Sequence, residues 1–375
     1  MADSNNMSDL WKRLRFVLIG IIVYRIGTHI PIPGIDPQRL SSLFDQNQGT
    51  ILELFNLFSG GALERMSIFA LNVVPYISAA IIMQLFSNSI PYLIELKKDG
   101  QAGRNAITQY TRYGTVLLAF IQASALAVTL SSGGLAYNPG TAFFVSAVFS
   151  VVAGTIFLMW LGEQISERGI GNGISIIIAT SILTGIPSAI GQALEQARQG
   201  DLNILMLLSI GVLAMVVIAV VVFIERGQRR ITVNYAQRQQ GRKLMQAQAS
   251  HLPFKVNMAG VIPAIFASTF LLFPASLSTW FGQGENFGFL QSISLALNPG
   301  QPLYVLTFAA LIISFCFIWL ALTFNTREVS DNLKRSGAYI PGIRPGEQTA
   351  GYIDNVLARL TVFGSIYLTL ICLLP

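Results

Sequence analysis

The sequence predicts an all-α membrane protein that crosses a bilayer several times. Of its 375 residues, 53% are hydrophobic and only 11% are charged, whereas soluble domains carry about 25% charged residues. The charged residues lie between long apolar stretches and seldom within them. A water-soluble globule of this composition would expose very large apolar patches. We therefore expect most of the chain to lie in lipid.

Nine apolar stretches are candidates for transmembrane helices. Crossing the hydrocarbon core takes about 20 residues of helix, and each stretch is near that length, although the fifth and seventh give weaker hydropathy signals. The expected spans are residues 14–30, 67–88, 107–130, 142–162, 171–191, 203–225, 256–278, 303–324 and 355–375.

Basic side chains give the expected orientation. Cytoplasmic segments of membrane proteins are enriched in Lys and Arg. Most of the 24 lysines and arginines lie in the N-terminal segment and in the second-to-third, fourth-to-fifth, sixth-to-seventh and eighth-to-ninth connections. The opposite side holds only Arg39, Arg65 and Arg198. This bias places the N-terminus in the cytoplasm.

Residues 50–58 (TILELFNLF) form an apolar stretch that is too short to cross a bilayer. At about 1.5 Å per residue, it would cover about 13 Å of a core about 30 Å thick. A glycine pair follows, and then a second predicted helix at residues 67–86 that contains Asn72 and Pro75. Irregular backbone at membrane depth is tolerated only where protein buries it or where it lines a water-filled cavity. The pattern predicts a cavity with a small mobile element beside it.

Two of the expected cytoplasmic connections are long. Residues 226–255 carry seven basic side chains and no acidic one, and residues 325–354 are rich in Gly and Pro. One interpretation is a pair of solvated loops that only fix the topology, and composition leaves it open. The other is a docking surface for a large acidic partner or for ribosomal RNA, because topology alone needs far fewer charges.

The sequence contains none of the common catalytic motifs. It has no HExxH, GxSxG or GxxxxGK sequence and no pair of membrane aspartates. The glycines of residues 169–173 neither follow a strand nor open a βαβ unit, so they predict a tight turn rather than a nucleotide site. Cys316 and Cys372 lie in expected spans, with a spacing that suggests neither a disulfide nor a metal site. We expect no enzyme activity, no cofactor and no metal.

Ion-coupled transport is also disfavoured. It needs titratable groups near the bilayer midplane, and no Asp or Glu lies in the middle of an expected span. A passive conduit driven by a partner fits this pattern better. A secondary transporter of a small solute remains the alternative, because it too would contain broken helices.

Aliphatic residues recur at helical spacing within two expected spans. Val73, Ile77 and Ile81 follow at i, i+4 and i+8 in the second span, and Ile174 and Ile178 repeat this spacing in the fifth. Such stripes usually face lipid or neighbouring helices, and that interpretation stays open. The alternative is a hydrophobic constriction, which excludes water and ions by dewetting. A constriction without fixed hydrogen bonds suits an irregular substrate such as a polypeptide.

Six sequence motifs are distributed over the chain. They are PIPGID (31–36), FSGGAL (58–63), QYTRYG (109–114), GEQI with RGIGNGIS (162–165 and 168–175), VNMAGVIPAIF (256–266) and IPGIRPGEQ (340–348). In this order and spacing they resemble the bacterial SecY family, the channel subunits of the general protein-export translocon. The resemblance covers essentially the whole chain.

The resemblance implies a channel of two inverted, pseudo-symmetric halves around an hourglass pore. Residues 1–192 would form the N-terminal half with spans one to five, and residues 203–375 the C-terminal half with spans six to nine. Residues 193–202 would form the hinge loop between the halves. Channels of this family have ten spans, of which nine are expected here, with the tenth missing after Pro375.

The resemblance also implies roles for individual residues. A plug in residues 50–65 would close the outer funnel with Thr50, Ile51, Leu52, Glu53, Leu54, Phe55, Asn56, Leu57 and Phe58. The pore ring would consist of Val73, Ile77, Ile174, Ile178 and Ile265. The lateral gate would include Ser78, Ile81, Gln84, Ser268 and Thr269. The motor or ribosome would dock on Arg242, Lys243 and Arg344.

These roles together imply a protein-conducting channel. It would export unfolded polypeptides across the bacterial inner membrane and insert membrane proteins laterally into the lipid. The partners implied by the resemblance are the SecE and SecG subunits, the SecA ATPase motor, the ribosome, polypeptides that carry signal sequences, and membrane lipid.

Overall fold

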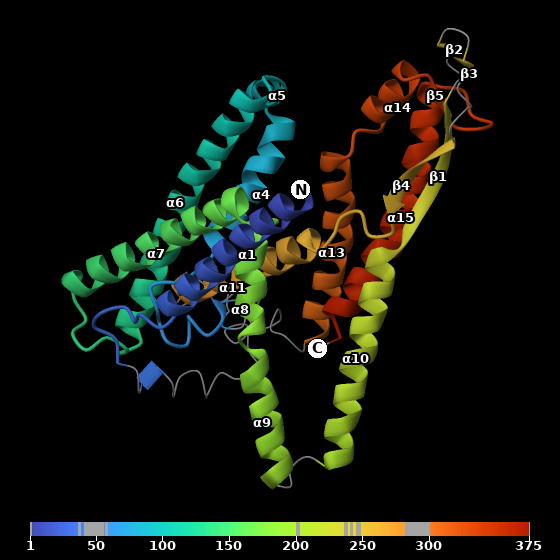
Figure 1. Cartoon of the computed structure of the whole chain (residues 1–375). Coiled ribbons are helices and arrows are strands. Elements are labelled where there is room, and N and C mark those ends of the chain that lie inside the picture. Colours follow the sequence, from blue (N-terminus) through green and yellow to red (C-terminus); the bar gives the residue numbers. More distant parts are fainter. Residues whose placement is uncertain are drawn as a thin grey trace. The chain divides into compact units, whose positions relative to one another are not determined.

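The computed structural model of the chain is predominantly helical (Figure 1). It describes residues 2–36, 39–40, 56, 59–199, 203–235, 239–240, 243–244, 249–281 and 301–374. The chain separates into two compact units. The first consists of Met1–Leu202 and Leu272–Gln301, and the second of Asn203–Leu271 and Pro302–Pro375.

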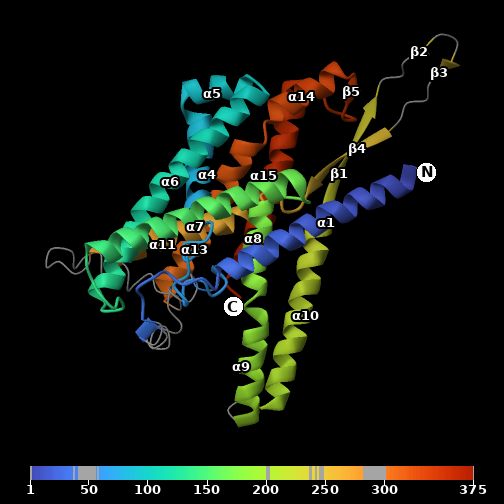
Figure 2. The ribbon, with the colours of Figure 1, turned by 60° about the vertical axis from the view of Figure 1, so that its left-hand side comes forward.

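The first unit is a bundle of helices. Its helices are α1 (Ala2–Gly27), α4 (Val74–Ser89), α5 (Pro91–Lys98), α6 (Gln101–Ser132), α7 (Thr141–Arg168), α8 (Gly173–Leu183) and α9 (Ile186–Gln199). The pairs α4 and α6, α6 and α7, and α7 and α8 pack against each other, and α1 runs alongside α7 (Figure 2). Small residues such as Ala119 and Ala123 of α6 are fully buried in the α6–α7 core, which lets the helix backbones approach closely.

The second predicted span begins later than the sequence suggests. We expected a helix from residue 67, but α4 begins at Val74, and residues 67–73 form turns. Asn72 has a φ of 48°, a left-handed conformation that no helix continues through. Pro75 lies in the first turn of α4, where its missing N–H costs nothing. At its other end α4 bends by 93° into α5.

The fifth predicted span is broken into two helices. Residues 171–191 were expected to form one helix, but α8 ends at Leu183, and α9 begins at Ile186 with Pro187 in its first turn. Because α9 continues to Gln199, residues 193–199 of the expected hinge loop are helical.

The second unit combines apolar helices with a small sheet. Its helices are α10 (Ile204–Arg226), α11 (Ile262–Phe281), α13 (Pro302–Thr323), α14 (Thr326–Arg335) and α15 (Glu347–Cys372), of which α11 extends across the boundary into the first unit. Its strands are β1 (Gln228–Tyr235), β2 (Gln239–Gln240), β3 (Lys243–Leu244), β4 (Ala249–Lys255) and β5 (Ala338–Tyr339).

The described parts of the two long connections, 226–255 and 325–354, are folded together rather than being plain loops. Strands β4, β1 and β5 form one antiparallel sheet in that order, with Gln228 opposite Lys255 and Asn234 opposite Tyr339. One face of β1 presents Ile231 to a core that also contains residues of β4, β5 and α15. Residues from the connections 226–255 and 325–354 therefore share one hydrophobic core.

Several helices are suited to cross a membrane. Among the described residues, five helices are long and apolar enough to do so, or six if the bent pair α4–α5 counts as one span. Each of the nine expected spans contains a helix. The others are shorter apolar helices, such as α8, or carry basic side chains, as α1 does with Lys12, Arg13 and Arg15.

Candidate functional site

Four of the expected pore-ring residues meet in one hydrophobic cluster of the first unit. Val73, which precedes α4, is only 1% exposed, and Ile77 follows one turn later. Ile174 and Ile178 lie on successive turns of α8 and pack against the same cluster. Its buried members are Val17, Tyr24, Ala62, Phe69, Val73, Leu158, Leu161, Ile165 and Ile177. The fifth ring residue, Ile265, is half-buried in α11, within the second unit.

The turn between α7 and α8 fixes the position of Ile174. The side chain of Asn172 caps α8 by accepting hydrogen bonds from the amides of Ile174 and Ser175 at 3.0 and 3.3 Å. A Cβ at Gly173 would overlap the carbonyl oxygen of Gly162, so only glycine allows α8 to approach α7 this closely. The predicted tight turn is confirmed, and its glycines serve helix packing.

Residues 59–73 pass between α1 and α7 as a series of turns. Two glycines make room for this segment. A Cβ at Gly27 of α1 would overlap the ring of Phe69, and a Cβ at Gly154 of α7 would overlap the carbonyl oxygen of Ile68. A backbone carbonyl cannot change its position as a side chain can, so residues 59–73 pack against α7 with no room for a larger residue at Gly154.

An aromatic stack crosses the same region. The ring of Phe69 lies parallel to that of Tyr24 with centroids 6.0 Å apart, and parallel to that of Phe157 at 5.9 Å. Trp160 continues the stack at a tilt, 5.8 Å from Phe157. These rings join α1, the turn segment and α7.

Four buried polar residues also meet beside this hydrophobic cluster, three through their side chains and Ser59 through its backbone carbonyl. They are Tyr24, Ser59, Asn72 and Ser181, and none is more than 3% exposed. The Tyr24 hydroxyl donates to the carbonyl oxygen of Ser59 at 3.1 Å and lies 2.6 Å from the Ser181 hydroxyl. The Asn72 amide donates to the same Ser181 oxygen at 3.1 Å. We name these four residues the polar node. Of these four residues, only Asn72 stands out in the sequence, because it is a polar residue within an apolar stretch.

Most of the expected plug lies outside the described residues. Thr50, Ile51, Leu52, Glu53, Leu54, Phe55, Leu57 and Phe58 are in this group. Asn56 is described, and its side chain exchanges two hydrogen bonds with Glu64, each 3.0 Å long. Its carbonyl oxygen accepts from the amide of Gly61 and the hydroxyl of Ser59. Asn56 is thus tied to the turn that follows it.

The expected gate residues are divided between the two units. Ser78, Ile81 and Gln84 are half-buried on α4, and Ser268 and Thr269 are half-buried on α11. The three hydroxyls each donate to a carbonyl oxygen in the preceding turn of their own helix at 2.8–3.1 Å. They are therefore compatible with an apolar environment.

The expected docking residues lie in the second unit. Arg344 is exposed, and its carbonyl oxygen accepts a 2.9 Å hydrogen bond from the buried hydroxyl of Thr349, which fixes the turn before α15. Lys243 belongs to β3, where it pairs with Gln240. Arg242 lies outside the described residues.

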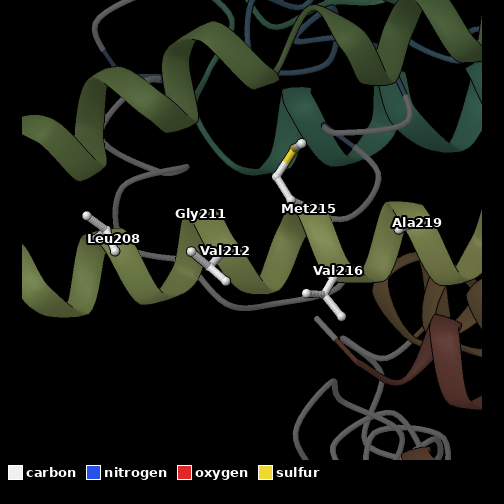
Figure 3. A pocket seen from close by; sticks show the side chains of 6 residues that line it. All are labelled: Leu208, Gly211, Val212, Met215, Val216 and Ala219. Atoms are coloured by element: carbon white, nitrogen blue, oxygen red, sulfur yellow. The ribbon is translucent and has the colours of Figure 1, made fainter.

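Helix α10 presents a predominantly apolar surface. A shallow, open hollow lies along one side of it and is lined only by Leu208, Gly211, Val212, Met215, Val216 and Ala219 (Figure 3). No described side chain of α10 is buried. Among the described residues no group of His, Cys, Asp or Glu could hold a metal ion, and Cys316 and Cys372 are both free thiols.

The family model of SecY matches residues 67–375 of the chain. The protein translocase subunit SecY of Pseudomonas aeruginosa is 63% identical over 373 residues, which is 100% of this chain and 84% of that protein. The chain belongs to the SecY family. The SecY subunit of Escherichia coli K12 is 60% identical over 378 residues, 100% of this chain and 85% of its own length.

Solved structures of SecY-type channels share the fold. A structure described as a protein-conducting channel has a TM-score of 0.67 at 17% identity and covers 95% of this chain and 83% of its own. Sec61 in a canine ribosome–channel complex has a TM-score of 0.63 at 15% identity, with 96% and 89% covered. As a member of the SecY family, the chain is a protein-conducting channel subunit and not an enzyme, and the alternative of a small-solute carrier is not supported.

Proposed function

We propose that the chain conducts unfolded polypeptides outward across the bacterial inner membrane through a constriction made by Val73, Ile77, Ile174, Ile178 and Ile265. The observation that carries this proposal is the clustering of four of these residues in the first unit. Branched aliphatic side chains offer no hydrogen bonds, so they exclude water and ions without selecting a particular sequence.

The proposed plug and lateral gate regulate this pathway. Residues 50–65 close the outer side at rest, and the described part of this segment is held against α1 and α8 by Ser59 and Gly60. Signal sequences leave toward the lipid along α4 and α11, which carry Ser78, Ile81, Gln84, Ser268 and Thr269. Half-exposed polar groups on an apolar helix lower the cost of passing a segment of mixed polarity.

The N-terminus is proposed to be cytoplasmic, as the distribution of lysine and arginine indicates. The basic residues of the second unit, which include Lys243 and the exposed Arg229, Arg230 and Arg344, would then receive the SecA motor or the ribosome. Ribosome-bound solved neighbours, the canine Sec61 complex and the yeast Ssh1 complex, support the second partner. SecE and SecG are proposed as accessory subunits.

Site-specific crosslinking tests the constriction. A photoreactive amino acid at Ile77 in the complete channel should form a strong adduct with a stalled export substrate, because Ile77 packs in the proposed ring. The matched control is Val216, which is 53% exposed on α10 (Figure 3). Equal adducts at the two positions, or none at Ile77, would show that the aliphatic stripe is ordinary packing.

A further inference from the structure

The polar node connects the elements that carry the proposed ring and the proposed plug. Asn72 directly precedes Val73, and Ser181 lies one turn after Ile178 on α8. Tyr24 reaches across from α1, 157 residues away from its partner Ser181. The node therefore connects two residues that lie next to proposed ring residues, Asn72 before α4 and Ser181 on α8.

The node ends on the backbone at the base of the plug. The Tyr24 hydroxyl has one proton, and its hydrogen bond to the Ser59 carbonyl uses it. The Ser181 hydroxyl also has one proton and two acceptors within reach, the Tyr24 oxygen at 2.6 Å and the Ile177 carbonyl oxygen of its own helix at 2.9 Å. When Tyr24 donates to Ser59, Ser181 donates to Tyr24 and Asn72 donates to Ser181, which gives a continuous chain of hydrogen bonds that polarise one another. The chain terminates at Ser59.

A second contact from α1 holds the next residue. Arg25 donates to the carbonyl oxygen of Gly60 at 3.2 Å. The Cα of Gly60 lies so close to α8 that a Cβ there would be 3.1 Å from the Cα and the carbonyl oxygen of Ser181. Gly60 and Gly61 have φ values of 66° and 78°, a conformation that glycine adopts without strain. The base of the plug is thus held between α1 and α8 at Ser59 and Gly60.

We propose that Tyr24, Asn72 and Ser181 form a latch that holds the Ser59 carbonyl, and with it the base of the plug, for as long as the ring is closed. A polypeptide that separates the ring residues moves Val73 away from Ile178, and so separates Asn72 from Ser181. Loss of the latch leaves the buried Ser59 carbonyl without its side-chain donor and favours release of the plug. Tyr24 is therefore a positioning residue that couples ring opening to plug displacement. This inference rests on the proposed roles of the ring and the plug.

Tyr24→Phe removes the hydroxyl group and keeps the aromatic side chain that stacks on Phe69. Loss of a buried hydrogen bond of about 1 kcal/mol corresponds to a change of roughly fivefold to tenfold in an equilibrium. We expect the amides of residues 59–63 to exchange hydrogen for deuterium roughly fivefold to tenfold faster in the complete protein. Resting ion leak through proteoliposomes should rise by a similar factor.

The matched control is Tyr113→Phe, since Tyr113 is 62% exposed on α6 and should change neither quantity. Ser181→Ala is the second variant, and the double variant with Tyr24→Phe should add little to either single change, because both break the same chain of hydrogen bonds. Asn72 is unsuitable as a test because its left-handed backbone itself favours Asn.

The two readouts separate the latch from the proposed function. Unchanged exchange at residues 59–63 in both single variants, with wild-type thermal stability, overturns the latch. Faster exchange with unchanged leak overturns the coupling of this clamp to the plug. Crosslinking at Ile77 tests the constriction independently of both results.

Discussion

Residues 59–73 and α10 show two ways in which a chain can satisfy its backbone within a membrane protein. Helix α10 makes its hydrogen bonds within itself, is the most apolar of the candidate spans, and has no buried described side chain. Residues 59–73 form turns, with left-handed backbone at Met66 and Asn72. Apart from the exposed Glu64 and Arg65, they are buried or half-buried between helices and are held by specific hydrogen-bond partners. Hydropathy therefore identifies α10 most strongly, whereas the candidate site depends on the irregular segment.

The largest difference between the two regions is expected when a glycine at each of them is replaced by valine. Gly154→Val should lower the free energy of unfolding by about 3 kcal/mol or more, because the new side chain meets the Ile68 carbonyl, which cannot move aside. Gly211→Val on α10 meets nothing within 4 Å and should change stability by less than about 0.5 kcal/mol. Thermal unfolding in detergent measures both. Equal losses would show that residues 59–73 are not wedged against α7.

A smaller effect is expected when a side chain is shortened. Val151 of α7 is 1% exposed, and Val151→Ala should cost roughly 1–2 kcal/mol through lost packing contacts. Val216→Ala on α10 removes the same atoms from a side chain that is 53% exposed, where lipid or detergent fills the space. Chemical unfolding of the two variants compares them directly. A larger loss at Val216 would mean that a partner covers α10.

The smallest contrast concerns the helix caps. Asn172→Ala removes two cap bonds, of 3.0 and 3.3 Å, and should destabilise the first turn of α8 by about 1 kcal/mol. Asn203→Ala on α10 removes a single cap bond of 3.4 Å and should cost only a few tenths of a kcal/mol. Hydrogen exchange of the first-turn amides reads out each cap. Similar changes in the two helices would contradict the assignment of Asn172 as the stronger cap.

The sequence predicts most of the helices because their signal is local. Apolar stretches of sufficient length correspond to α6, α7, α10, α13 and α15. The late start of α4 is visible only in hindsight, from a proline and an asparagine within an apolar stretch. The sheet also has a local signal, since Ile231 and Val233 alternate with polar residues in β1. The dense positive charge around these residues is also typical of a solvated loop, one of the two interpretations left open, and the structure shows a sheet.

The polar node could not be predicted in the same way. Tyr24 and Ser181 are 157 residues apart, and their hydrogen bond depends on the packing of α1 against α8. Ser59 contributes its backbone carbonyl, a group that every residue has. The aliphatic residues of the ring were recognised from spacing and family resemblance. That four of them, Val73, Ile77, Ile174 and Ile178, meet in one cluster depends on the three-dimensional fold.

The small sheet has a mechanical consequence for the second unit. Only Gly227 separates the end of α10 from β1, and the amide of Val256, just after β4, donates to the Gly227 carbonyl at 3.1 Å. Because only one residue links β1 to α10, a force applied to the exposed side chains of β1 is transmitted directly to α10. The core shared with α15 transmits the same load to a second helix. The sheet, α10 and α15 thus form one mechanically continuous element of the second unit.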